Sequence, residues 1–88
     1  MTNAYLLDGS QMQDLPSAHR YLKEMLNFPE YYGNNLDALF DCLTEFSDET
    51  LIWIENENQM HPKLEKVFLD AMDENSSLMV ILESGESL

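Results

Sequence analysis

The chain has 88 residues, 17 acidic side chains against 4 basic ones, and a formal charge of −13. At about 100–200 residues per domain, this length predicts a single domain over residues 1–88. The lone cysteine cannot form an internal disulfide, which excludes a disulfide-stabilised scaffold and fits a reducing compartment. No basic segment leads into an apolar run at the N-terminus, and no stretch of about 18 apolar residues occurs. The sequence therefore predicts a cytoplasmic protein without a signal peptide or a membrane span.

The charge also restricts the partners. Nucleic-acid binding places Lys and Arg against phosphates, so a strongly acidic body is repelled from nucleic acid and from anionic membranes. Acidic chains that stay disordered have low hydrophobicity and few aromatic residues. Here 44% of the residues are apolar, and the chain has four Phe, four Tyr and one Trp. We therefore expect a folded domain with an acidic surface, no nucleic-acid or membrane partner, and a cationic protein as the natural target.

The first half of the chain predicts one strand and two helices. A short apolar run from Ala4 to Leu7 ends in a turn pair and predicts the strand. The next apolar residues have helical spacing after a candidate N-cap at Asp14, and this helix must end before Pro29: Leu15, Ala18, Leu22, Met25 and Leu26. A turn and cap then open a second helix, whose apolar positions are Leu36, Leu39, Phe40 and Leu43.

The second half predicts two strands around a third helix. The run from Thr50 to Ile54 is continuously apolar, which is typical of a strand buried on both faces. Pro62 suits a first helical turn, and the helix that follows has the apolar stripe Leu64, Val67, Phe68, Ala71 and Met72. Asn75 ends this helix, and the run from Leu78 to Leu82 predicts the last strand. Whether residues 56–61 form a further short helical turn stays open at this point.

The element order is β-α-α-β-α-β. Strands separated by helical connections of a dozen or more residues are expected to run parallel and to be joined by right-handed crossovers. The sequence therefore predicts an α/β domain with a three-stranded parallel sheet packed by helices.

No catalytic signature is present. The chain lacks a nucleophile elbow, a Gly-rich phosphate loop, an HExxH zinc motif and any Cys/His cluster at ligand spacing. We expect His19 and His61 to be surface residues and Cys42 to be a small buried thiol. Two carboxylates on one turn of an exposed helix do not enclose an ion. The sequence therefore predicts no enzyme, no metal and no cofactor.

Carboxylate placement is the unusual feature. Between Lys23 and Lys63 the chain has no Lys or Arg but nine acidic residues. Three of them follow i, i+4, i+8 spacing on one helical face, where like charges repel by a few tenths of a kcal/mol per pair. The third helix ends in further acidic residues, which oppose the helix dipole there. The two groups are Asp37, Asp41 and Glu45, and Asp70, Asp73 and Glu74. A solvated surface would explain such runs structurally, and a shared cationic target would explain them functionally.

The segment from Phe28 to Thr44 reads FPEYYGNNLDALFDCLT. It resembles the PEYYGxNLDALxDCLT signature of the barstar family, intracellular inhibitors of secreted guanyl-specific ribonucleases of the barnase type. The fold of that family, a small parallel sheet covered by helices, agrees with the predicted element order. The resemblance implies that the second helix and the loop before it block the active site of a ribonuclease.

By position, the resemblance implies a partner-binding surface on the second helix, the loop before it and the third helix. Asp41 stands where the family has its dominant aspartate, which occupies the phosphate pocket of the enzyme. Phe40 and Phe46 stand where the family has tryptophans, so they keep hydrophobic contact but lose the indole N–H donors. The complete implied set is Tyr31, Gly33, Asn34, Asn35, Asp37, Phe40, Asp41, Phe46, Asp70 and Glu74.

Two functional hypotheses follow. The first is an inhibitor of a basic, barnase-type ribonuclease whose acidic and aromatic surface imitates RNA phosphate. The alternative is an acidic immunity or interaction module that neutralises a different basic toxin or a nucleic-acid-binding protein. Both need Asp37 and Asp41, whereas only the first needs Tyr31 and Phe40 to fit the rim of a guanine-type pocket. The sequence indicates no oligomeric state.

Overall fold

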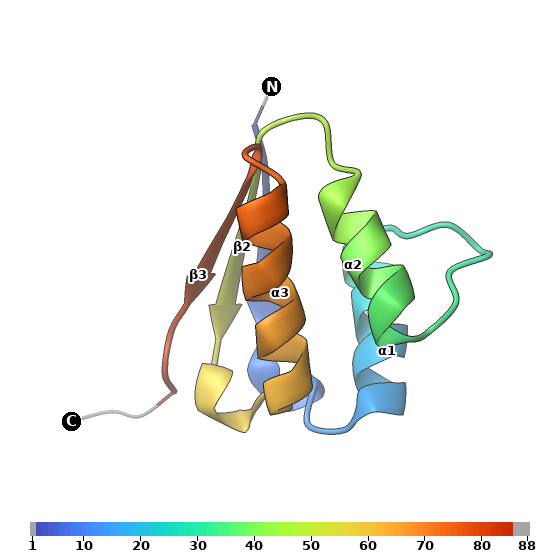
Figure 1. The fold of residues 1–88 in the computed structure, drawn as a ribbon. Coiled ribbons are helices and arrows are strands. Elements are labelled where there is room, and N and C mark those ends of the chain that lie inside the picture. Colours follow the sequence, from blue (N-terminus) through green and yellow to red (C-terminus); the bar gives the residue numbers. More distant parts are fainter. Residues whose placement is uncertain (1, 86–88) are drawn as a thin grey trace.

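The computed structural model describes residues 2–85. It contains three α-helices, three strands and two short 3-10 helices in the predicted β-α-α-β-α-β order (Figure 1). The sequence left open whether residues 56–61 form a further helical turn, and the structure has a single 3-10 turn there, η2. The elements are β1 (Asn3–Asp8), η1 (Gly9–Gln11), α1 (Leu15–Met25), α2 (Leu36–Thr44), β2 (Thr50–Glu55), η2 (Glu57–Gln59), α3 (Pro62–Glu74) and β3 (Leu78–Leu82).

The sheet has the order β1-β2-β3, and both neighbouring pairs are parallel. Leu6, Trp53 and Ile81 share one row of the register. Helical segments connect the strands in sequence, which gives the chain the length that parallel pairing requires. The predicted α/β fold with a three-stranded parallel sheet is therefore confirmed.

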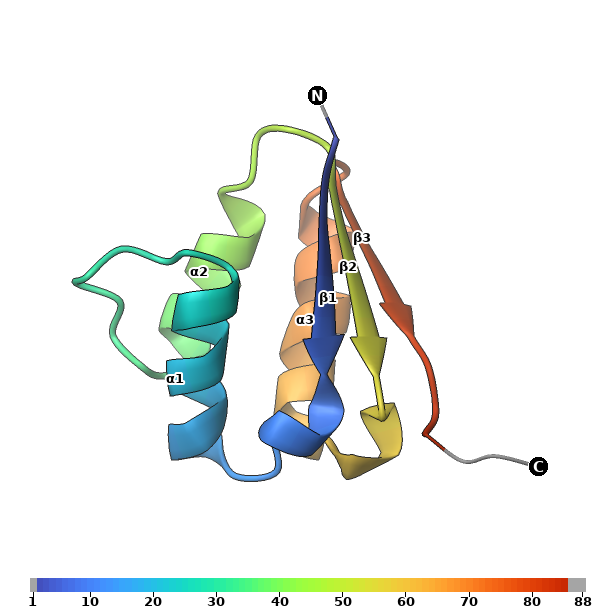
Figure 2. The same cartoon turned by 180° about the vertical axis from the view of Figure 1, so that it is seen from behind.

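The sheet is covered on one face only. Ile52 and Ile54 are fully buried beneath the helices, whereas the outward side chains of Leu6, Trp53 and Met79 are 58%, 38% and 57% exposed. The view from behind shows the strands in front of α3 (Figure 2). The prediction that the strand from Thr50 to Ile54 is buried on both faces is wrong, because a continuous apolar run does not specify whether a second helical layer exists.

The ends of α1 lie where the sequence predicts them. The Asp14 carboxylate caps the helix by accepting a hydrogen bond from the Ser17 N–H at 2.8 Å. At the other end, Asn27 adopts a left-handed conformation with φ 57°, and the Phe28 N–H donates to the Lys23 carbonyl at 2.9 Å. The chain therefore leaves the helix two residues before Pro29.

The core fixes α2 against α3. Leu39 and Leu43 of α2 are fully buried in the same cluster as Leu64 and Phe68 of α3, and the two helices are in contact. Burying a side chain of this size contributes about 1.5–3 kcal/mol. The opposite side of α2, with Asp37 and Asp41, is consequently held in place and exposed to solvent. No helix within residues 2–85 is both long and apolar enough to span a bilayer.

Candidate partner-binding surface

The entry into α2 is fixed by one asparagine. Asn35 accepts a hydrogen bond from the Ala38 N–H at 2.7 Å and donates its side-chain amide to the Gly33 carbonyl at 3.3 Å. Asn34, in front of it, has a left-handed φ of 53°, a conformation that Asn tolerates better than most residues. A Cβ at Gly33 would lie 3.1 Å from the amide nitrogen of Asn35. The loop of residues 27–35, called the binding loop below, therefore enters the helix in a defined geometry.

The carboxylates of Asp37, Asp41 and Glu45 are all exposed. Asp37 lies in the first turn of α2, where the positive end of the helix dipole favours a carboxylate. Asp41 follows one turn later. Glu45 is the C-cap residue of the helix, through its backbone N–H. The ion pairs found within residues 2–85, Lys23–Glu30 and Lys66–Asp70, do not include any of the three. The charge on this helix is therefore not neutralised within the described fold.

Two grooves flank the start of α2. The first, of about 410 Å³, lies between the binding loop and α2, with Asp41 and Glu45 on its wall. The second, of about 580 Å³, lies between α1 and the start of α2, with Asp37 and His19 on its wall. Of the implied site residues, Tyr31, Gly33 and Phe46 also border the first groove, and Asn34 and Asn35 border the second. The structure thus brings seven of the ten implied residues to these two hollows.

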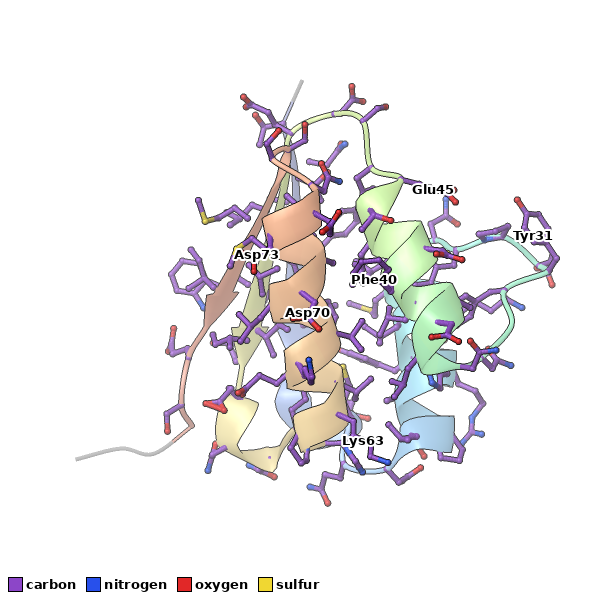
Figure 3. The ribbon with its side chains drawn as sticks, in the orientation of Figure 1. Tyr31, Phe40, Glu45, Lys63, Asp70 and Asp73 are labelled. Atoms are coloured by element: carbon purple, nitrogen blue, oxygen red, sulfur yellow. The ribbon has the colours of Figure 1, made fainter. Side chains whose placement is uncertain are left out.

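The two adjacent tyrosines of the binding loop differ completely in exposure. Tyr31 is 88% exposed at the outer tip of the loop (Figure 3), whereas Tyr32 is only 6% exposed. The Tyr32 ring lies 4.9 Å from the ring of Phe28, and its hydroxyl is 2.7 Å from Nδ1 of His19. Tyr32 therefore anchors the loop, and Tyr31 is displayed by it.

The expectation that both histidines lie on the surface is wrong for His19. Its side chain is only 3% exposed, and burial lowers the pKa of its imidazole. His61 is half-buried, and its Nδ1 accepts a hydrogen bond from the Lys63 N–H at 3.1 Å at the start of α3. The spacing of His19 with Leu15 and Leu22 places all three on the apolar face of α1, and this is the signal that could have indicated burial.

The aromatic residues that stand in for tryptophans are not freely displayed. Phe40 is half-buried against the core and lies between α2 and α3 (Figure 3). Phe46 is also half-buried, with its ring 6.4 Å from that of Tyr5. Both rings therefore contribute to the packing of this chain, and only part of each surface is available to a partner.

The remaining implied residues, Asp70 and Glu74, are exposed on α3. Asp70 forms an ion pair with Lys66, with 3.0 Å between Nζ and Oδ2. Because α3 packs beside α2, its acidic end adds to the field around the α2 carboxylates. The charge of Asp70 is partly compensated, unlike that of Asp41.

The thiol of Cys42 borders the first groove and is half-buried rather than fully buried. Burial, together with the nearby carboxylates of Glu45 and Asp41, raises its pKa. The thiol therefore stays protonated at neutral pH and is a poor nucleophile. Across residues 2–85, no group of three or more His, Cys, Asp or Glu side chains is arranged to hold a metal ion.

Two comparisons with known proteins found similarity to this chain. The family model described as Barstar (barnase inhibitor) matches residues 2–79. A curated protein of Bacillus subtilis (strain 168), named "Putative ribonuclease inhibitor YrdF", is 49% identical over 43 residues. The aligned segment covers 49% of this chain and 47% of that protein, so the match spans about half the length of the relative. Both descriptions are of inhibitors and not of enzymes.

Proposed function

This chain belongs to the barstar (barnase inhibitor) family, and from this premise we propose that it binds a basic, barnase-type ribonuclease and blocks its active site. The blocking surface consists of the binding loop and the exposed side of α2. The chain itself performs no catalysis, and it acts in the cytoplasm of the cell that makes it.

One observation carries the proposal. Asp37 and Asp41 lie one turn apart on α2, exposed and outside the ion pairs found in residues 2–85. Like charges at this spacing repel, so the arrangement lowers the stability of the isolated helix. A ribonuclease holds RNA phosphates in a cationic cavity, and two carboxylates on one helix are complementary to such a cavity. Tyr31, at the tip of the adjacent loop, adds an aromatic contact of the kind that dominates binding energy.

The distribution of charge favours rapid association. The four basic residues lie on α1 and α3, and α2 has none. A net charge of −13 produces a field that attracts a cationic enzyme over a distance of about one Debye length, roughly 10 Å at 0.1 M salt. The association rate should therefore fall as the salt concentration rises.

The alternative, an acidic module that neutralises another basic toxin or a nucleic-acid-binding protein, is favoured by the half-buried position of Phe40. With that ring packed between α2 and α3, it offers a partner less aromatic contact than a fully exposed ring would. A partner recognised by charge alone would tolerate the loss of Tyr31, whereas a ribonuclease pocket would not.

The experiment is a titration of RNA cleavage by a panel of purified guanyl-specific ribonucleases. We expect the wild-type chain to inhibit at least one enzyme stoichiometrically and the Asp37→Asn/Asp41→Asn double variant to lose most of this inhibition. Glu49→Gln, in the loop after α2, is the matched control and should behave as wild type. Tyr31→Ala separates the two hypotheses, because only the ribonuclease inhibitor should be weakened by it. If no ribonuclease is inhibited while a different basic protein binds through Asp37 and Asp41, the alternative replaces the proposal.

A further inference from the structure

A buried hydrogen bond joins α1 to the binding loop. Nδ1 of His19 lies 2.7 Å from the hydroxyl of Tyr32, and the two side chains are 3% and 6% exposed. The His19 and Tyr32 rings are 5.7 Å apart, and Tyr32 also packs on Phe28. We call this contact the His19–Tyr32 brace.

The binding loop projects away from the sheet in both views of the fold (Figures 1 and 2). Its other connections to α1 near the tip are weak, because Lys23 reaches Glu30 only at 3.4–3.5 Å and on the exposed side of the molecule. Exposed ion pairs of this kind contribute about 0–1 kcal/mol. Tyr32 lies directly between Tyr31 and Gly33, so the brace is the interior contact nearest to the displayed tip of the loop.

The brace also lies between the two grooves. Tyr32 forms part of the wall of the first groove, which Asp41 also borders, and His19 forms part of the wall of the second, which Asp37 also borders. The hydrogen bond therefore joins two side chains that line the same grooves as the carboxylates of the proposed site.

We propose that His19 is a positioning residue for the partner-binding surface, acting through Tyr32, and that protonation of its imidazole weakens binding of the partner. The inference rests on the proposed function and specifies how that site is held and regulated. His19 itself need not touch the partner.

The chemistry of the brace explains the dependence on pH. When neutral His19 carries its proton on Nε2, Nδ1 accepts a hydrogen bond from the Tyr32 hydroxyl. Burial raises the pKa of that phenol, so Tyr32 stays neutral. A protonated Nδ1 becomes a donor, so the hydroxyl must turn around, and a charge is placed in a buried site.

The charged and titratable groups around His19 determine the direction of the effect. Arg20 of α1 borders the same groove and opposes a second positive charge, and the Cys42 thiol near Tyr32 is neutral. Asp37 of α2 is the carboxylate on the wall of that groove, but burial alone lowers the pKa of His19, without an opposing contribution from this carboxylate. A cationic partner that binds Asp37 brings further positive charge to the groove that His19 borders. Binding and protonation therefore oppose each other. By linkage the affinity is full above the pKa of His19 in the free folded chain, which burial holds below the ordinary value, and it falls as the pH drops below that pKa.

The test compares inhibition constants of four chains against one inhibited ribonuclease between pH 8 and pH 5.5. Tyr32→Phe removes the hydroxyl, His19→Asn keeps a polar atom near the Nδ1 position without a titrating group, and His19→Leu removes the hydrogen bond. We expect Tyr32→Phe and His19→Leu to weaken inhibition about tenfold at pH 8. We expect His19→Asn to retain more of the affinity at pH 8, and the ratio of wild-type to His19→Asn affinity to fall as the pH is lowered. Both affinities are measured against the same ribonuclease, so the effect of pH on the enzyme itself cancels in the ratio.

Tyr21→Phe is the matched control, because the Tyr21 hydroxyl accepts a hydrogen bond from the Asp8 N–H at 2.9 Å on the same helix but away from the binding loop. It should lower the free energy of unfolding without changing inhibition by the folded fraction. If Tyr21→Phe weakens inhibition as much as Tyr32→Phe does, or if the ratio does not change with pH, the positioning role is wrong. If the wild-type chain inhibits no ribonuclease, the proposed function fails first, and the two failures are therefore distinguishable.

Discussion

The side-chain amide of Asn75 donates hydrogen bonds to the carbonyl oxygens of Phe46, at 2.9 Å, and Leu43, at 3.1 Å. The residue that ends α3 therefore also closes the C-terminal end of α2. Its side-chain oxygen accepts a third hydrogen bond, from the Ser77 N–H at 3.0 Å. A helix end leaves carbonyl groups without intrahelical partners, and here a side chain from the neighbouring helix satisfies them.

Asn75→Ala should lower the free energy of unfolding by about 1–3 kcal/mol, because it leaves part-buried carbonyl groups without a donor. Urea unfolding monitored by circular dichroism measures this as a lower midpoint with an unchanged slope. Ser76→Ala, an exposed turn residue next to it, should change the stability by less than about 0.5 kcal/mol. If the two variants lower the free energy of unfolding equally, the hydrogen bonds from Asn75 to α2 do not contribute to stability.

The α2 carboxylates should differ in their effects on binding. Asp41→Ala should weaken inhibition at least about 30-fold, since a charge pair that loses one buried partner costs about 2 kcal/mol or more. Asp37→Ala should weaken it about tenfold. Glu49→Ala should change it less than about twofold, because Glu49 lies beyond α2 and contacts Thr2 at 3.2 Å. Isothermal titration with the inhibited ribonuclease measures all three, and three equal losses would contradict a localised surface.

Lys66→Ala tests whether Asp70 faces the partner. The Lys66 and Asp70 side chains are 77% and 51% exposed, so breaking their ion pair should change the free energy of unfolding by less than about 0.5 kcal/mol. The variant leaves the Asp70 carboxylate unpaired, so association measured by stopped flow should be faster at low salt and converge with wild type at high salt. Lys63→Ala makes the same charge change at the start of α3 and has no ion pair with Asp70. If both variants accelerate association equally, Asp70 does not contact the partner.

Glu65→Gln should stabilise the fold at neutral pH. A hydrogen bond to Glu57, together with burial and the charge of Glu57, raises the pKa of Glu65. The folded protein therefore binds this proton more tightly than the unfolded chain does, and the resulting stability is present at low pH and lost as the pH rises through the folded pKa. Gln keeps a donor for Glu57 without the charge, so the midpoint of thermal unfolding should rise at pH 7 but hardly at pH 4. Glu74→Gln, exposed on the same helix, is the control. A rise of the same size at both pH values would rule out this explanation.

Local signals were enough to predict the ends of the helices. Asp14 is the N-cap of α1 and Pro62 is the first residue of α3, as the sequence indicated. The cap that the sequence placed before α2, within residues 33–35, is Asn35. Each of these choices depends on contacts within three or four residues, which a sequence pattern contains directly. The order of strands and helices then restricts the sheet to parallel pairing.

Which side chains are buried depended on longer-range contacts, which the sequence pattern does not contain. The run around Trp53 is apolar at every position, yet its alternate residues face solvent because all three helices lie on the other side of the sheet. Histidine is polar and is usually found at the surface, but His19 is buried. It can lie in the interior because the Tyr32 hydroxyl of the binding loop forms a hydrogen bond with its imidazole.

The sequence by itself determined the acidic charge, the capped helices and the order of elements in this protein. Only the tertiary structure decided which of two neighbouring tyrosines is displayed. Tyr31 and Tyr32 are identical residues in the same loop, but the Tyr32 hydroxyl meets His19, thirteen residues earlier in the chain, and Tyr31 meets no such partner in the interior. Burial depends on how α1 and the binding loop pack together, and no local pattern of residue types contains that information.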